Sequence, residues 1–293
     1  MHFKSLGYYI LKLLTWPMQL FPLKFHYLIS DVLYVLIYRI VKYRINVVRT
    51  NLTNSFPDKN LSELKEIEKA FYHGFSDMFI ETLYFTHINI CKHNKRLKLI
   101  NVENLTNPIS QGRNVIVVAG HFGNWEFMQL FAKKIETNKY FIYKKLNNKA
   151  FDRFYSDLRS RAAKPLEMKE TARVLLSKSN HPFTAYFISD QRPVPEEIKH
   201  WVTFMNQETP VLLGTEKIAK KTNAVVVYLE VKKIKRGYHQ ATFTTLCESA
   251  SKTATHEITD RFFEMLEQSI NKSPDQYFWT HKRWKYKSEM FTN

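Results

Sequence analysis

A histidine and a glutamate five residues apart, His121 and Glu126, are the pair best suited to chemistry in this sequence of 293 residues. The run Val115–Ala119 before them is short, apolar and rich in β-branched residues, which predicts a strand buried on both faces of a parallel sheet. Gly120 and Gly123 permit a tight turn after this strand, and helical character resumes a few residues later. Both side chains are therefore expected at a strand-to-helix turn, where α/β folds place their chemistry.

From the first turn of that helix, Glu126 could reach back to an imidazole nitrogen of His121. A carboxylate in that place fixes the tautomer and favours the imidazolium that forms when histidine accepts a proton. We interpret the pair as a general base with its orienting carboxylate, suited to deprotonating a hydroxyl that attacks an activated acyl group. A buried structural hydrogen bond is the alternative for an isolated pair of this spacing. Zinc binding is not indicated, because the string is not His-Glu-x-x-His.

The balance of charge calls for an anionic partner, because 44 Lys and Arg residues oppose 27 Asp and Glu residues, a net charge of +17. Nucleic acid, an anionic bilayer and an acidic carrier protein or substrate are the candidates. We expect no nucleic-acid partner, since the sequence has no zinc-finger spacing, RNP1-like string or continuous basic helix. Cys91 and Cys247 stand alone, which argues against a metal site or a disulfide framework and agrees with a reducing compartment.

Residues 1–45 differ from everything after them, because residues 6–23 and 25–41 form two strongly apolar, aromatic-rich runs. Charged residues interrupt both runs, so neither has the ~18 uncharged residues of a clear transmembrane helix. We expect a membrane-embedded or interfacial helical segment, followed by a basic cluster typical of the cytoplasmic side. A single tilted span and a helical hairpin packed on the domain are the alternatives. The interrupting residues are Lys12, Lys24, Asp31 and Arg39.

The rest of the chain, residues 46–293, is expected to form one domain, because no linker divides it. Apolar residues recur at helical spacing over 61–85, and from residue 114 strands alternate with helices. This alternation predicts a three-layer α/β fold with a largely parallel sheet. After the turn, strands are expected at 140–143, 183–188, 224–231 and 241–247, and helices at 124–136, 148–161, 170–178 and 211–221. A loop is expected at 192–209, and a final helix capped by Thr255 and ending near 271.

Other stretches carry residue types that bind anionic or polar groups. Arg159 and Arg161 lie on an expected helix, and the planar fork of arginine binds phosphate or carboxylate bidentately. Asp190 and Gln191 end a buried strand at the carboxyl edge, where α/β sheets bind ligands. Near the C-terminus, Trp279 combines with neighbouring lysines and arginines as interfacial aromatics and cations do, although packing in the core is the alternative for such a residue.

These stretches, in this order, resemble the motifs of the bacterial lysophospholipid acyltransferase family that includes the late acyltransferases of lipid A biosynthesis. The string His-Phe-Gly-Asn-Trp-Glu at 121–126 matches the first motif, and Asp152 followed by Arg159 and Arg161 matches the second. Residues 143–148 resemble the Tyr-Arg-Pro…Asn-Pro string with two lysines in place of Arg-Pro, and residues 202–210 lack the glycine of a family loop. Residues 274–285 are close to the C-terminal Pro-Glu-Gln-Tyr-x-Trp-x-His-Arg-Arg string.

The resemblance implies a glycerol-3-phosphate acyltransferase-like fold. It implies an enzyme that moves an acyl chain from acyl carrier protein to a hydroxyl of a membrane glycolipid, usually a Kdo-bearing lipid A precursor. The expected place is the cytoplasmic face of the bacterial inner membrane, and no metal or organic cofactor is required. His121 would be the base and Glu126 its orienting residue. Another acceptor, such as an aminolipid or a polyene pigment, and a non-catalytic lipid-binding protein are the alternatives. The residues implied in substrate binding are Asn124, Tyr143, Arg159, Arg161, Asp190 and Gln191.

Overall fold

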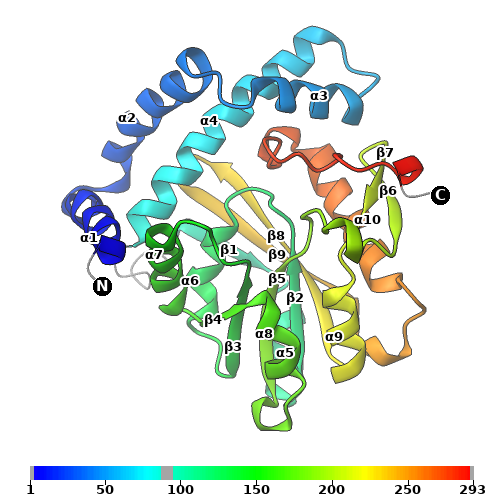
Figure 1. Cartoon of the computed structure of the whole chain (residues 1–293). Coiled ribbons are helices and arrows are strands. Elements are labelled where there is room, and N and C mark those ends of the chain that lie inside the picture. Colours follow the sequence, from blue (N-terminus) through cyan, green and yellow to red (C-terminus); the bar gives the residue numbers. More distant parts are fainter. Residues whose placement is uncertain (1–2, 87–94, 291–293) are drawn as a thin grey trace.

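A seven-stranded sheet forms the centre of the molecule in the computed structural model, which describes residues 3–86 and 95–290 (Figure 1). Its strand order is β1-β9-β8-β2-β5-β3-β4, and every neighbouring pair is parallel except the β8–β9 hairpin. The strands are β1 (Leu97–Ile100), β2 (Val115–Ala119), β3 (Asn138–Tyr143), β4 (Lys164–Glu167), β5 (Phe183–Ile188), β8 (Val225–Lys235) and β9 (Tyr238–Cys247).

The strand β2 lies in the middle of this sheet and is buried throughout. Its successive side chains point to opposite faces, so Ile116 and Val118 enter one core cluster while Val115 and Val117 enter another. Helices cover both faces, which makes the three-layer α/β fold with a mostly parallel sheet that the sequence predicted. The helices are α1 (Phe3–Thr15), α2 (Leu23–Tyr34), α3 (Ile45–Ser55), α4 (Leu61–Phe85), α5 (Glu103–Ser110), α6 (Met128–Ala132), α7 (Lys149–Ser160), α8 (Met168–Leu175), α9 (Gly214–Thr222) and α10 (Glu257–Lys272).

The long helix α4 begins and ends where its apolar periodicity predicted. A capping box defines its start. Asn60 accepts hydrogen bonds from the first turn, and the side chain of Glu63 accepts one from the backbone of Asn60. This capping box satisfies backbone donors that have no partner inside the helix. The helix contributes side chains to both core clusters, so it joins the two layers of helices at one end of the sheet.

The prediction of a loop over 192–209 is wrong for its second half. An antiparallel hairpin of β6 (Trp201–Phe204) and β7 (Gln207–Pro210) lies there. Its two turn residues, Met205 and Asn206, both have positive φ, as in a type I′ turn. No pattern over these residues predicts the turn, because the usual Asn-Gly pair is missing. The proposed cap at Thr255 is also wrong, because α10 begins after His256, which makes no side-chain capping bond.

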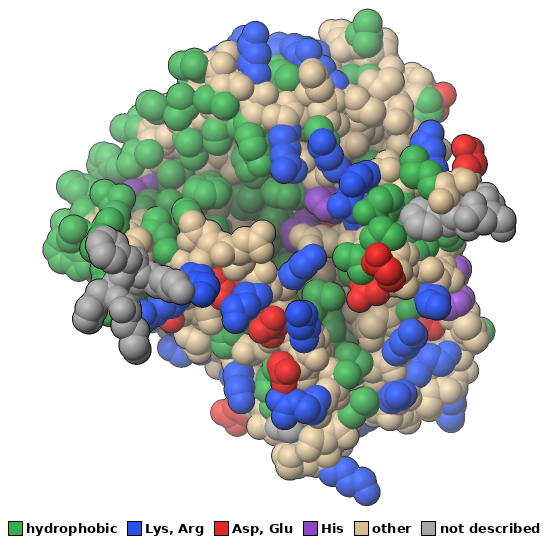
Figure 2. Space-filling model, in the orientation of Figure 1, with side chains coloured by type: hydrophobic (Ala, Val, Ile, Leu, Met, Phe, Trp, Pro, Cys, Tyr) green, Lys and Arg blue, Asp and Glu red, His purple; other side chains and the backbone are tan. Residues whose placement is uncertain are grey.

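The N-terminal segment forms two α-helices, α1 and α2, joined by the 3-10 helix η1 (Trp16–Leu20), with a π-helical turn over Val35–Ile40. Pro17 and Pro22 lie at the starts of η1 and α2, so the prolines divide the segment. Helix α2 packs along α4, while a broad apolar surface remains exposed on the outside of both N-terminal helices (Figures 1 and 2). No helix within residues 3–86 and 95–290 combines the length and the apolar character that a membrane span needs.

Candidate active site

His121 and Asp190 meet at the carboxyl edge of the sheet, just beyond the ends of the neighbouring parallel strands β2 and β5. The two strands are paired in register, with Ala119 opposite Ile188, so the residues that follow them lie side by side. One carboxylate oxygen of Asp190 is 2.5 Å from Nδ1 of His121, and the other accepts the backbone N–H of His121 at 3.0 Å. Asp190 therefore fixes both the ring and the backbone of the histidine.

The structure does not bring Glu126 to His121, so that part of the sequence prediction is wrong. The carboxylate of Glu126 is buried and accepts hydrogen bonds from Arg159 at 2.6 Å and from Gln129 at 2.7 Å. The chain leaves the turn as a short 3-10 helix, η4 (Trp125–Phe127), which places Glu126 among α6 and α7. Among the described contacts, the carboxylate that orients the imidazole belongs to Asp190.

Contact with His121 favours the ionised form of Asp190 over the protonated form. Burial alone would raise the pKa of Asp190, but the imidazole and backbone N–H of His121 outweigh it and lower the pKa. An ionised Asp190 keeps a proton on Nδ1 of His121, which leaves a lone pair on Nε2. The side chain of His121 is 15% exposed, and the amide nitrogen of Gln191 lies 3.3 Å from Nε2. The imidazole can therefore accept a proton from a group that enters beside it.

A cleft opens beside His121 and is lined by α4, by the turn after β2, by β8 and β9, and by the C-terminal stretch 275–278. Figure 2 shows a hollow near its centre with histidine side chains in it. The apolar N-terminal surface borders the hollow on one side, and lysines and arginines lie along its other sides. Trp125 packs edge-on against the imidazole, with ring centroids 4.6 Å apart, and Phe278 lies 5.8 Å away. These rings limit access of water to His121 from the sides that they cover.

The C-terminal stretch 275–278 holds the turn that carries His121 through backbone hydrogen bonds. The backbone N–H of Phe278 donates to the carbonyl of His121 at 3.1 Å, and that of Gly123 donates to the carbonyl of Gln276 at 2.8 Å. Gly123 has a φ of +60°, and a Cβ atom there would lie 1.8 Å from the backbone oxygen of Val231. Only glycine fits at this position, which gives Gly123 a role beyond the tight turn inferred from the sequence.

The remaining residues implied in substrate binding make their described contacts within the protein. Asn124 is buried and bonds to Glu81 and to the backbone of Glu126. Arg161 donates to a backbone carbonyl of α4, while Tyr143 is half-buried at the end of β3, where burial raises the pKa of its hydroxyl. Of the predicted site residues, the structure therefore brings together His121, Asp190 and Gln191, and separately Glu126 and Arg159.

Several residues of the cleft were not identified from the sequence. Glu81, Lys233 and His239 all line it, yet they come from a helix and two strands that carry no motif. The one available signal was that Glu81 interrupts a run of apolar residues on α4. Trp279 was read as an interfacial aromatic, but it is completely buried, so packing in the core is its role.

The cysteines and acidic residues give no metal site in the described part of the chain. Cys247 is a free, half-buried thiol, and Cys91 lies outside the described residues. Over residues 3–86 and 95–290, no group of three His, Cys, Asp or Glu side chains is arranged to hold a metal ion.

The chain matches a known protein family over nearly its whole length. Residues 1–286 match the family described as bacterial lipid A biosynthesis acyltransferase. No curated protein matches the chain. The family match includes both the apolar N-terminal helices and the C-terminal stretch that clamps the turn.

Proposed function

Because the chain belongs to the bacterial lipid A biosynthesis acyltransferase family, we propose that it transfers a fatty acyl chain from acyl carrier protein to a hydroxyl of a membrane glycolipid. It is an acyltransferase that acts on lipid, and the proposed acceptor is a Kdo-bearing lipid A precursor. The proposal includes the glycerol-3-phosphate acyltransferase-like fold. The observation that carries it is the His121–Asp190 pair at the edge of the cleft.

The pair supplies the proton transfers that this reaction requires. Nε2 of His121 accepts the proton of the acceptor hydroxyl as its oxygen attacks the thioester carbonyl carbon. Asp190 stabilises the imidazolium that forms. The carbon–sulfur bond then breaks, and the imidazolium returns the proton to the thiolate of the carrier. The products are the ester and the free thiol, so this step consumes no other reactant.

Glu126 acts outside these proton transfers. Its ion pair with Arg159, at 2.6 Å, joins the segment after the catalytic turn to α7, and both side chains are largely removed from water. We therefore assign this pair to positioning, because an arginine already paired with a buried carboxylate is a poor site for an acceptor phosphate. Among the described residues lining the cleft, Lys233 is the cation, and we assign the acceptor phosphate to it.

The exposed apolar surface of the N-terminal helices supports a place on a membrane. The outward-facing large apolar side chains on α1 and α2 are 46–73% exposed, and Figure 2 shows apolar side chains gathered over one side of the molecule. A contiguous apolar surface of this kind marks a site of protein or membrane association. We propose that it enters the interfacial region of the inner membrane from the cytoplasmic side, which places the cleft close to lipid acceptors. The most exposed of these side chains are Leu13, Leu14, Leu28 and Val32.

Transfer assays with defined substrates test the proposed function. The purified protein is incubated with acyl carrier protein bearing a labelled acyl chain and with a Kdo-bearing lipid A precursor in mixed micelles. Mass spectrometry should show the mass of one added acyl group, and folded His121→Ala protein should not produce it. Acylation of an aminolipid or pigment alone would replace the proposed acceptor. Binding of lipid without any transfer would identify a non-catalytic protein.

A further inference from the structure

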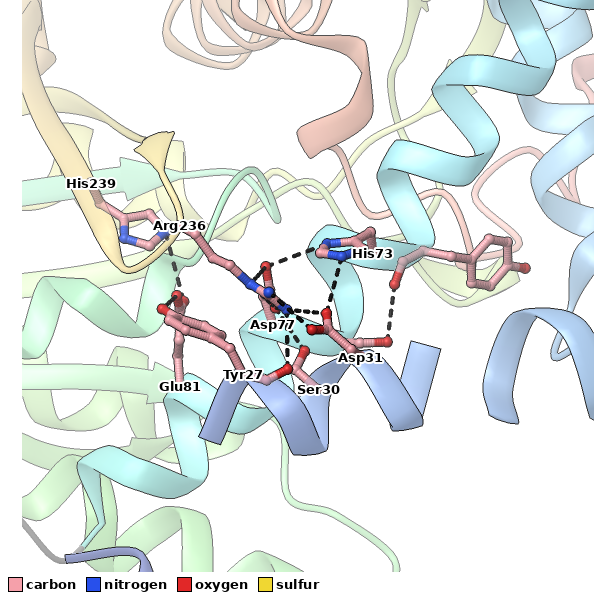
Figure 3. A network of polar contacts seen from close by, with 10 residues as sticks. Tyr27, Ser30, Asp31, His73, Asp77, Glu81, Arg236 and His239 are labelled. Carbon is pink, nitrogen blue, oxygen red and sulfur yellow. Dashed lines mark hydrogen bonds and ion pairs between the residues drawn. The ribbon is translucent and has the colours of Figure 1, made fainter. Parts of the chain in front are cut away.

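Glu81 is a buried carboxylate at the wall of the cleft, and the proposed proton transfers do not use it. It lies on α4 and is 1% exposed. One carboxylate oxygen accepts a hydrogen bond from the hydroxyl of Tyr27 at 2.7 Å, and the other accepts one from the amide of Asn124 at 2.8 Å. Nε2 of His239 lies 3.8 Å from the carboxylate oxygen of Glu81 that accepts from Asn124 (Figure 3).

The contact with Asn124 connects Glu81 to the catalytic turn. The amide oxygen of Asn124 already accepts the backbone N–H of Glu126, so its NH2 group must find an acceptor elsewhere. Glu81 is that acceptor, and Asn124 follows His121 by three residues in the same turn. A buried amide without this acceptor would lose a hydrogen bond, and the turn that carries the imidazole would lose a fixed point.

The surroundings of Glu81 offer little compensation for a negative charge. Burial raises the pKa of Glu81 to about 7, against the lowering effect of its hydrogen bonds from Asn124 and Tyr27. Burial also lowers the pKa of His239 to about 3, so this imidazole is neutral and supplies no positive charge. Asp77 raises the pKa of Glu81 further and Lys233 lowers it. A negative charge on Glu81 is therefore costly at this position. The described hydrogen bonds that depend on it are those from Tyr27 and Asn124.

The contact with Tyr27 connects the same carboxylate to the N-terminal helices. Tyr27 lies on α2, whose outer side carries part of the exposed apolar surface. Further contacts hold α2 in place, among them a hydrogen bond from Ser30 to Asp77 at 2.7 Å. Arg236, from the β8–β9 turn, pairs with Asp31 on α2 and with Asp77 on α4 (Figure 3). Glu81 is thus bonded directly both to the element proposed to face lipid and to the turn that carries His121.

We propose that Glu81 is a positioning residue that couples the seating of α2 to the geometry of His121. This inference rests on the proposed function for its kinetic consequences, but the geometric coupling does not depend on it. Misplacement of a reacting group by about 1 Å can cost ~10²-fold in rate. Loss of the coupling should therefore lower kcat and leave KM nearly unchanged, because Glu81 is buried and its described hydrogen bonds are all within the protein.

The test compares Glu81→Gln with Glu66→Gln, which makes the same change at an exposed position of α4. Glutamine can accept from only one of the two donors, so we expect kcat of Glu81→Gln to fall by about tenfold to 10²-fold, with KM within about twofold. The double variant Glu81→Gln/Asn124→Asp restores the hydrogen bond with its direction reversed and should recover most of the loss. Equal kcat for the two single variants, or no recovery in a folded double variant, would overturn the proposal.

A second pair of variants tests the connection to α2. Tyr27→Phe removes the hydroxyl that donates to Glu81. Tyr34→Phe removes a hydroxyl on the same helix, and that hydroxyl makes none of the described hydrogen bonds. Only Tyr27→Phe should lower kcat, and by less than Glu81→Gln does. Equal values for the two tyrosine variants would refute the coupling to α2.

A reactivity measurement separates this proposal from the proposed function. Diethyl pyrocarbonate modifies accessible, unprotonated imidazole, and mass spectrometry gives the rate of modification at His121. That rate should change severalfold in Glu81→Gln, stay unchanged in Glu66→Gln, and return toward the wild-type value in the double variant. This pattern in a protein that transfers no acyl group would reject the function and retain the coupling. An unchanged rate in Glu81→Gln would reject the coupling itself.

Discussion

Asp190→Asn is the substitution that bears most directly on the proposed base. Asparagine can still accept the backbone N–H of His121 with its oxygen, but its NH2 group then faces Nδ1 and donates to it. The ring proton must move to Nε2, which is the nitrogen that has to accept the hydroxyl proton. General base catalysis is worth ~10²–10⁴-fold, or about 2.7–5.4 kcal/mol at about 1.36 kcal/mol for each factor of ten. We expect kcat/KM to fall by that factor.

The assay measures initial rates of acyl transfer for Asp190→Asn and for Asp275→Asn. Asp275 lines the same cleft, and none of its described side-chain contacts is with the imidazole, so it controls for the loss of a negative charge near the site. A thermal unfolding curve for each variant shows whether it is folded at the assay temperature. Similar kcat/KM values for the two variants would refute the assignment of Asp190 to the orienting role.

The same substitution predicts a dependence of stability on pH. Because the pKa of Asp190 is lowered in the folded protein, its contribution to folding is present above the unfolded value of about 3.9. That contribution is lost as the pH falls through the lowered, folded value. The difference in free energy of unfolding between the wild type and Asp190→Asn should therefore be largest near neutral pH and shrink below about pH 4. Denaturant titrations at several pH values measure it, and a constant difference would contradict the lowered pKa.

Three further predictions follow from the contacts around the site. Arg159→Gln leaves the carboxylate of Glu126 buried without its cation and should destabilise the fold by about 3–5 kcal/mol in denaturant titrations, whereas Arg173→Gln at an exposed pair should cost about 0–1 kcal/mol. Gly123→Ala should cost more than about 1 kcal/mol and lower the melting temperature, because its Cβ collides with a backbone oxygen. Serine at four exposed apolar positions should reduce binding to anionic vesicles in flotation assays without lowering the melting temperature, and unchanged flotation would place the membrane contact elsewhere. These positions are Leu13, Leu14, Leu28 and Val32.

The local elements of this protein were determined by sequence patterns that operate over a few residues. A run of β-branched residues predicted β2, and the two glycines after it predicted the turn that carries His121. Apolar residues at helical spacing made α4, and the alternation that follows specified a mostly parallel sheet. The apolar, helical character of the N-terminal segment also follows from composition, whereas its packing along α4 was left open by the sequence. Each of these features depends on neighbours in the chain, so each could be predicted.

The partners of the reactive side chains were decided only by the tertiary structure. The sequence placed both Glu126 and Asp190 near strand or turn ends, and nearness in the chain favoured Glu126. The pairing of β2 with β5 instead brings Asp190 to His121 across 69 residues, while α7 brings Arg159 to Glu126 across 33. Strand order and register depend on how the whole core packs, and a pattern over a few residues does not encode them.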